Sequence, residues 1–197
     1  RIIAMLDRHI DIMADCLRKE AEALNNIADS ITLQSTEFAE EISKCKGKIV
    51  FTGVGKSFIV ASKISGTLSS IGVSSIAINP LPLLHGDLGF LDSDDILIAL
   101  SNSGETDILI EVLKCVKSLG VEILSITGSI NSTIAEMSYK SVEVKTVEAG
   151  PFGLVPTTST TAMMAYGDAL ACLLVELLQL TISDFHRNHP NGELSKF

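Results

Sequence analysis

The sequence predicts an α/β fold of the doubly wound, flavodoxin-like kind, in which helices sandwich a five-stranded parallel sheet and additional helices precede it. Two observations support this prediction. Short runs of β-branched and aliphatic residues alternate with helix-period segments, and loops rich in glycine, serine or threonine follow most of these runs. Strands buried on both faces form near-continuous apolar runs, and crossover helices join parallel strands. The alternation therefore indicates a parallel sheet.

The first 45 residues contain neither glycine nor proline, and their apolar side chains recur at helical spacing. This period predicts two long helices. The recurring positions are Ile2, Leu6, Ile10 and Met13, followed by Leu17, Ala21, Leu24 and Ile27. Because these helices carry apolar residues on more than one face, packing on their own sheet and contact with another chain both explain the pattern.

The remaining residues, 46–197, are expected to form the α/β core of a single domain that spans 1–197, a length that suits one domain. The predicted strands are 48–55, 74–80, 95–104, 122–128 and 140–146. The predicted helices are 57–71, 106–119, 132–137 and 159–178, and a polar tail is expected after them.

Composition excludes several classes of protein. The net charge is −9 and no basic cluster is present, which argues against a nucleic-acid partner. The longest apolar runs, such as ALACLLVELL at 169–178, fall short of the roughly 20 residues that span a bilayer, so no membrane partner is expected. The four cysteines are widely spaced without a C-x-x-C pair, which predicts buried, reduced thiols in a cytoplasmic protein and no metal site. They are Cys16, Cys45, Cys115 and Cys172.

The stretch FTGVGKS, residues 51–57, resembles a nucleotide-binding loop but matches neither the P-loop nor the dinucleotide-binding pattern. A P-loop, G-x-x-x-x-G-K-[ST], requires glycine at position 50, which is Val50. A dinucleotide fingerprint that starts at Gly53 requires glycine at position 58, which is Phe58. A strand, a glycine turn and a helix start remain, and a helix N-terminus still binds anions.

In doubly wound sheets, ligands bind beyond the carboxyl ends of the strands, so the loops after the strands are the place to search. The most informative is SNSGET, 101–106, in which three hydroxyls surround a glycine turn just before a helix. Hydroxyl groups, backbone N–H groups and the helix dipole are expected to converge there as a phosphate cradle. An ordinary helix N-cap at Ser103 or Thr106 explains the same residues. The cluster TTSTT at 157–161 has the same two explanations.

Five motifs in order carry a family resemblance: GVGKS, HGDLG, SNSGET, EAGPFGLVPTTSTT and HP-N-G. Together they resemble the sugar isomerase (SIS) domain, and within it the arabinose-5-phosphate isomerase branch, over about residues 45–195. The resemblance implies a sugar-phosphate ligand, a five-stranded parallel sheet and a homotetramer, or a dimer, with active sites at subunit interfaces. Many members of that branch continue into a CBS-type regulatory module, whereas this chain ends at Phe197.

Matching positions give the site residues that the resemblance implies. The substrate and its phosphate are assigned to Gly55, Ser57, Ser101, Asn102, Ser103, Gly104, Thr106, Thr158, Ser159 and Thr160. The catalytic residues are Lys56, His85, Glu148 and His189. No cofactor and no metal are implied.

The implied reaction interconverts an aldose and a ketose phosphate through an enediol, with D-arabinose 5-phosphate and D-ribulose 5-phosphate as the substrate pair. Ring opening and proton transfer between C1 and C2 suit His85, His189 and Glu148, and a cation such as Lys56 offsets oxyanion charge. Taken without the resemblance, Glu148 is as readily a solvated loop carboxylate, a lone loop histidine is incidental, and Lys56 is a surface lysine at a helix start.

One position departs from the family pattern S-G-E-x-x-E, in which a second carboxylate follows the first by three residues. Here that position is Ile108, and the neighbouring Asp107 would point about 100° away around the helix. Two alternatives therefore stay open: a domain that binds a sugar phosphate without converting it, and an isomerase of another ketose phosphate.

Overall fold

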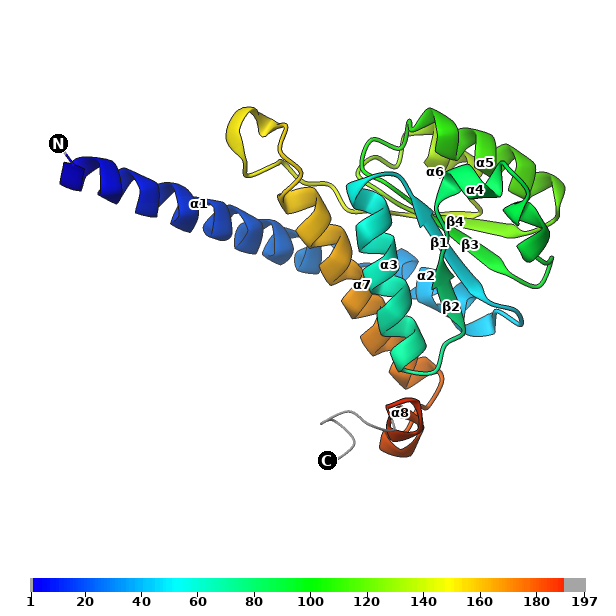
Figure 1. Ribbon diagram of the computed structural model, residues 1–197. Helices are drawn as coiled ribbons and strands as arrows, with labels where there is room; N and C mark the ends of the chain where they lie inside the picture. The colour runs from blue at the N-terminus through cyan, green and yellow to red at the C-terminus, as the bar shows by residue number, and fades with distance from the viewer. Residues whose placement is uncertain (1, 190–197) are drawn as a thin grey trace.

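The computed structural model describes residues 2–189 and places five parallel strands in the order β2-β1-β3-β4-β5 (Figure 1). The strands are β1 (Ile49–Gly53), β2 (Ser75–Ala77), β3 (Ile96–Ser101), β4 (Glu122–Thr127) and β5 (Lys140–Glu143). This is the flavodoxin-like order, so the predicted fold class is confirmed. β2 and β5 are shorter than the sequence predicts, because each lies at a sheet edge with one neighbour.

The helices are α1 (Ile2–Asp29), α2 (Leu33–Lys44), α3 (Lys56–Ser70), α4 (Pro80–Leu83), α5 (Asp107–Ser118), α6 (Thr133–Met137), α7 (Thr158–Leu177) and α8 (Ile182–Asn188), with short 3-10 turns η1 (Asp87–Phe90) and η2 (Pro151–Gly153). Two of them differ from expectation. The segment expected as a polar tail forms α8, because Thr181 and Asp184 cap each other reciprocally. The loop expected after β2 contains α4, which Asn79 caps by accepting from the Leu81 N–H.

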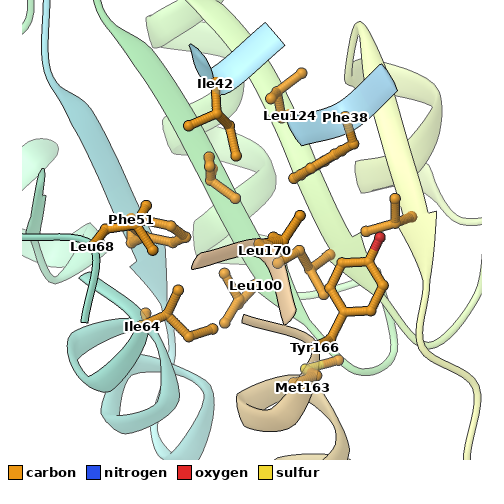
Figure 2. Packing of buried hydrophobic residues seen from close by; sticks show 14 of the residues in the cluster. Phe38, Ile42, Phe51, Ile64, Leu68, Leu100, Leu124, Met163, Tyr166 and Leu170 are labelled. Atoms are coloured by element: carbon orange, nitrogen blue, oxygen red, sulfur yellow. The ribbon is translucent and has the colours of Figure 1, made fainter. Parts of the chain in front are cut away.

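The two faces of the sheet bury separate hydrophobic layers. On β3, Ile98 and Leu100 face α2, α3 and α7, whereas Leu97 faces α5. The first layer includes Phe38, Phe51, Ile64 and Leu170, which Figure 2 shows converging over the strands. Strand residues are buried on both faces because helices cover both, which is the reason for the near-continuous apolar runs in the sequence.

The longest apolar helix, α7, belongs to this core. By length and composition α7 could cross a membrane, and its apolar stretch is longer than the sequence analysis expected. It packs instead on α1, α2 and α3. Gly167 lets α7 approach α3 closely, because a Cβ atom there would overlap the Ile64 side chain. The apolar composition of α7 therefore serves packing within the fold.

The sequence left two explanations open for the apolar N-terminal helices: packing on their own sheet and contact with another chain. The two helices differ in this respect. α2 packs on its own sheet, with Phe38 and Ile42 in the core. The last turns of α1 pack on the core, and the helix extends away from the sheet in Figure 1. Its apolar residues farther from the sheet are exposed: Leu6 (52 %), Ile10 (64 %), Met13 (73 %) and Leu17 (68 %). At 100° per residue these four lie within about 60° of one another, so they form one stripe.

The prediction of buried thiols is wrong. Cys172 is exposed, and the other three cysteines are half-buried, although all four are free as expected. Cys172 lies on α7 but on the side away from the core, because its neighbour Ala171 takes the inward position. Helical periodicity places a residue near a face, and only the packing decides which face is covered.

Candidate functional site

The predicted binding loops lie together at the carboxyl ends of the strands. β2, β1 and β3 are neighbours in the sheet, and the chain leaves them toward His85, Lys56 and the 101–106 turn respectively. The chain order reverses between β1 and β3, which is the position where doubly wound folds bind ligands. In Figure 1 this is the upper end of the sheet, where α3 begins.

The β1–α3 turn leaves the start of α3 without a side-chain cap. Gly53 lets strand and helix approach closely, because a Cβ there would lie 3.0–3.1 Å from Ser57 and the Leu100 carbonyl oxygen. Gly55 is the N-cap residue, with φ 59°, and has no side chain that could accept from the first turn of the helix. Lys56 is the first residue of α3 and is exposed. The Ser57 and Phe58 N–H groups donate to the Val54 and Gly55 carbonyls at 3.1 and 3.2 Å. An anion at this turn would therefore meet the Lys56 ammonium and the positive end of the helix dipole.

The 101–106 turn is held in shape by its own hydroxyls. The buried Ser101 Oγ accepts the Gly104 N–H at 3.0 Å and lies 3.0 Å from the Thr106 Oγ1. Ser103 Oγ accepts the Glu105 N–H at 3.2 Å. Thr106 occupies the N-cap position of α5, yet its side chain makes no capping hydrogen bond. The simple N-cap explanation therefore does not describe this loop, and the first turn of α5 is open to an anion.

The turn is also braced against the β4–α6 connection. Gly104 has φ 69°, and a Cβ atom there would overlap Ser132. The Gly104 carbonyl accepts the Ile134 N–H at 3.0 Å. Glu105 Oε1 accepts the Thr133 N–H at 2.8 Å. Hydrogen bonding from the side chain and the backbone of Thr133 lowers the pKa of Glu105. Glu105 is thus a carboxylate at the N-terminus of α6 that fixes the turn.

Glu148 follows β5 and closes the N-terminus of α7. Its Oε2 atom accepts the Thr157 N–H at 2.8 Å, the Thr157 hydroxyl at 3.1 Å and the Ser159 N–H at 3.2 Å. Partial burial raises the pKa of Glu148, but the hydrogen bonds from Ser159 and Thr157 lower it more, so the net shift is downward. The carboxylate is ionised at neutral pH and is held in place, unlike a solvated loop glutamate.

The hydroxyls of residues 158–160, which the sequence analysis assigned to substrate binding, make hydrogen bonds within the protein at the start of α7. Thr158 and Ser159 are buried, and Thr158 Oγ1 accepts the Ala149 N–H at 3.0 Å. Thr160 Oγ1 donates to the Thr157 carbonyl at 2.9 Å. The Thr158 hydroxyl therefore ties the 148–157 loop to α7, whereas the Thr160 hydroxyl bonds within the start of the helix itself.

The two predicted histidines lie in different parts of the molecule. His85 is exposed in the turn after α4, on the same edge of the sheet as Lys56. His189 ends α8, where its ring stacks on Phe185 with 4.1 Å between centroids and its Nδ1 lies 2.9 Å from the Phe185 carbonyl oxygen.

The structure places His189 away from the other predicted catalytic residues. Asn188 donates to the Ser70 carbonyl at 3.4 Å, so α8 lies beside the last turn of α3. Lys56 begins that helix, about 20 Å away along its axis. Within one chain, His189 does not join the site.

Comparison with known proteins decides the family. The model of the SIS domain matches residues 41–173, which include every predicted site residue except His189. The chain belongs to the SIS domain family. The chain is 39 % identical over 182 residues to the arabinose 5-phosphate isomerase KpsF of Escherichia coli O6:H1 strain CFT073. It is 36 % identical over 178 residues to the arabinose 5-phosphate isomerase KdsD of Pseudomonas aeruginosa.

Those alignments cover 91 % and 90 % of this chain but 56 % and 55 % of the relatives, so the chain spans about half the length of the curated relatives it matches. A solved structure of an E. coli CFT073 protein in complex with arabinose 5-phosphate superposes with a TM-score of 0.90 at 36 % identity, covering 93 % of this chain and 98 % of that one. The sequence, fold and site region therefore agree on one family.

Sequence reasoning missed three residues that shape the site. Gly53 permits the close strand–helix approach, Glu105 fixes the SNSGET turn to α6, and Thr157 gives Glu148 two of its hydrogen bonds. Glu105 alone carried a signal, since a carboxylate next to a tight turn is suited to a helix N-terminus. Its partner, Thr133, lies 28 residues further along the chain, so only the tertiary structure identifies it.

Proposed function

We propose that this protein is a sugar-phosphate aldose–ketose isomerase that interconverts D-arabinose 5-phosphate and D-ribulose 5-phosphate. The observation that carries the proposal is the open N-terminus of α5 behind the shaped 101–106 turn. Lys56, the first residue of α3, follows the neighbouring strand β1. The similarity to named arabinose 5-phosphate isomerases supports the choice of substrate.

The phosphate is assigned to the 101–106 turn. The uncapped first turn of α5 supplies N–H groups, and the helix dipole favours negative charge there. Asn102 and Ser103 are exposed and reach an incoming group, whereas the buried Ser101 keeps Gly104 and Thr106 in position. This arrangement recognises phosphate without a lysine in the turn itself.

The reacting carbons are assigned to the space between Lys56, His85 and Glu148. Glu148 serves as the base that moves a proton between C1 and C2, because its lowered pKa keeps it ionised. Lys56 offsets the charge on the enediol oxygens, and His85 assists ring opening. Turnover requires Glu148 to exchange one of its hydrogen bonds from α7 for the substrate proton.

His189 reaches this site from a second copy of the chain. Its position at the far end of α3 excludes it from the site of its own chain, and the exposed apolar stripe of α1 is a surface that a second copy would cover. We therefore assign the active site to a subunit interface of a homo-oligomer, with a tetramer as the expected state.

The test is a substrate panel. The protein is incubated with D-ribulose 5-phosphate, D-arabinose 5-phosphate and hexose phosphates, and loss of one sugar and gain of its isomer are followed by NMR in deuterated water. Turnover of the pentose phosphates with deuterium entering at C2 supports the proposal. A folded protein that binds the sugar phosphates without turnover or exchange contradicts it.

A second function is favoured by Ile108. This half-buried residue lies in the first turn of α5, where the family pattern has a carboxylate. A domain that senses a sugar phosphate without converting it requires the cradle but not the proton-transfer groups. Saturable binding of D-arabinose 5-phosphate with no exchange at C2 would assign the protein to this class.

A further inference from the structure

The Thr157 hydroxyl, at the end of the loop that joins Glu148 to α7, has two acceptors within reach. Its Oγ1 atom lies 3.1 Å from the Glu148 Oε2 atom and 3.1 Å from the Val155 carbonyl oxygen. The same Oγ1 atom accepts the Ala149 N–H at 3.1 Å. Because a threonine hydroxyl has a single proton to donate, it donates fully to only one of the two acceptors at a time.

The hydroxyl is the adjustable donor at this carboxylate. The other two hydrogen bonds to the Glu148 Oε2 atom come from backbone N–H groups, those of Thr157 at 2.8 Å and Ser159 at 3.2 Å. The backbone at the start of α7 fixes the direction of these two groups, whereas the hydroxyl proton turns about one bond. Glu148 therefore can lose the hydroxyl hydrogen bond without any change in the helix.

The charge on Glu148 decides which acceptor is the better one. A hydrogen bond to an ionised group is roughly twice as strong as one between neutral groups. An ionised Glu148 therefore attracts the Thr157 hydroxyl away from the Val155 carbonyl. A protonated Glu148 is neutral and loses this advantage, so the hydroxyl turns to Val155.

Hydrogen bonds, and not a neighbouring cation, stabilise the charge on Glu148. The charged side chains on the elements around the start of α7 are Lys19, Glu20 and Glu22 on α1, Lys145 in the segment before Glu148, and Lys56 and Lys63 on α3. In the described part of the chain, none of them forms an ion pair with Glu148, and residues 158–161 have no titratable side chain. Partial burial raises the pKa of Glu148, and the hydrogen bonds from Ser159 and Thr157 lower it by more.

The Val155 carbonyl belongs to a loop that projects from the start of α7, the yellow loop in Figure 1. Its tip is exposed, with Phe152 at 93 % and Leu154 at 78 %. A hydrogen bond within the tip joins the Gly153 N–H to the Gly150 carbonyl at 3.3 Å. A donor that moves between Glu148 and Val155 would therefore act on a segment with little packing to resist it.

We propose that the Thr157 hydroxyl follows the charge of Glu148, donating to the carboxylate when Glu148 is ionised and to the Val155 carbonyl when Glu148 is protonated. Thr157 is then a positioning residue for the base, and its hydroxyl is the hydrogen bond that Glu148 gives up when it takes the sugar proton. This catalytic consequence rests on the isomerase activity proposed above. The exchange between the two acceptors does not.

The exchange is tested without substrate, by carbon-13 NMR of the Val155 carbonyl at pH 7 in the 197-residue chain. Glu148→Gln supplies the neutral form of the side chain, so we expect it to shift the Val155 signal. Thr157→Val removes the hydroxyl and keeps the backbone N–H, and in this background Glu148→Gln should leave the Val155 signal in place. In a Thr157→Ser background, which retains a hydroxyl, the shift should return.

Thr161→Val is the matched control, because its hydroxyl lies in the same first turn of α7 but meets Glu20 at 3.2 Å. In this background the effect of Glu148→Gln on Val155 should be the same as in the wild type. An identical Val155 signal in the wild type and Glu148→Gln overturns the proposal. A shift that persists undiminished in the Thr157→Val background overturns it as well.

The catalytic consequence is tested by the pH dependence of kcat/KM for the pentose phosphates. Loss of a donor to the ionised form raises the pKa of Glu148, so the acid limb of the Thr157→Val profile should move to higher pH. Thr157→Ser should restore the limb, and Thr161→Val should not move it. Turnover with an unmoved limb in Thr157→Val would remove Thr157 from the mechanism. No turnover in any variant or in the wild type would contradict the isomerase activity and leave the Val155 result standing.

Discussion

Glu148 and Thr157 are joined twice: the Glu148 Oε2 atom lies 2.8 Å from the Thr157 nitrogen and 3.1 Å from the Thr157 Oγ1. The carboxylate thus replaces the missing cap of α7, since the Thr157 side chain at the N-cap position makes no capping hydrogen bond of its own. One residue therefore has two assigned tasks, a structural one that the hydrogen bonds show and the proton transfer that we propose.

Substitution of Glu148 separates these two tasks. Glu148→Gln keeps an acceptor oxygen but removes the charge, so we expect unfolding to become easier by about 1–2 kcal/mol and turnover to fall at least about 100-fold. Denaturant titration and the isomerase assay measure the two effects. Glu176→Gln, near the other end of α7, is the matched control and should change neither. Loss of stability with unchanged turnover would remove Glu148 from the mechanism.

The same carboxylate predicts a pH dependence of stability. The folded-state pKa of Glu148 is lowered from its ordinary value of 4.5, so its contribution is complete above pH 4.5 and is lost as the pH falls through the lower folded value. Asp95 and Glu105 also have lowered pKa values and add to the acid sensitivity of the wild type. The wild type and Glu148→Gln should therefore differ in stability at pH 7 and converge toward pH 3. A constant difference across that range would contradict this assignment.

Two glycines should respond to alanine with opposite signs. Gly104→Ala places a Cβ against Ser132 at φ 69°, so we expect a loss of about 2 kcal/mol or more. Gly66→Ala lies inside α3, where a Cβ meets nothing within 4 Å, so we expect a gain of about 0.5–1 kcal/mol. Thermal unfolding of both variants gives the signs. Equal effects of the two substitutions would show that the 101–106 turn is not held as the structure describes.

The proposed interface site predicts rescue between two inactive variants. If Glu148 and His189 of one site come from different copies, Glu148→Gln and His189→Ala chains mixed after denaturation should regain up to about a quarter of the wild-type activity, because chains assemble at random. Each variant refolded alone is the control. No recovery from a mixture that has exchanged subunits would place both residues in one chain or outside the mechanism.

The exposed stripe of α1 predicts which surface holds the copies together. Met13→Glu puts a charge in the middle of the stripe, and light scattering at micromolar concentration should show smaller particles than the wild type gives. Arg8→Glu changes a charge on the opposite side of the same helix and should leave the assembly intact. A wild type that is monomeric at micromolar concentration would refute the shared site itself.

The sequence analysis predicted the architecture well because the fold depends on local patterns. Apolar runs that end in glycine or serine, such as 49–53 and 96–101, specify buried strands, and the helical period between them specifies crossover helices. The position of the loops at one edge was predictable for the same reason, since a parallel sheet brings the carboxyl ends of its strands together there. Their role in binding stays a prediction. Segments with weak periodicity, such as the short α4 and α8, were missed because capping by Asn79 or Thr181 decides them.

The sequence by itself determined the sheet, the family and the group of loops at which a ligand would bind. Only the tertiary structure decided which partners the polar groups of those loops have. Glu105 is hydrogen-bonded to the start of α6, and Glu148 to the start of α7. His189 lies at the far end of α3. The physical reason is that a strand or helix is specified by neighbours along the chain. A hydrogen-bond partner is instead specified by proximity in space. Glu105 and Thr133, for example, are hydrogen-bonded although they lie 28 residues apart in the sequence.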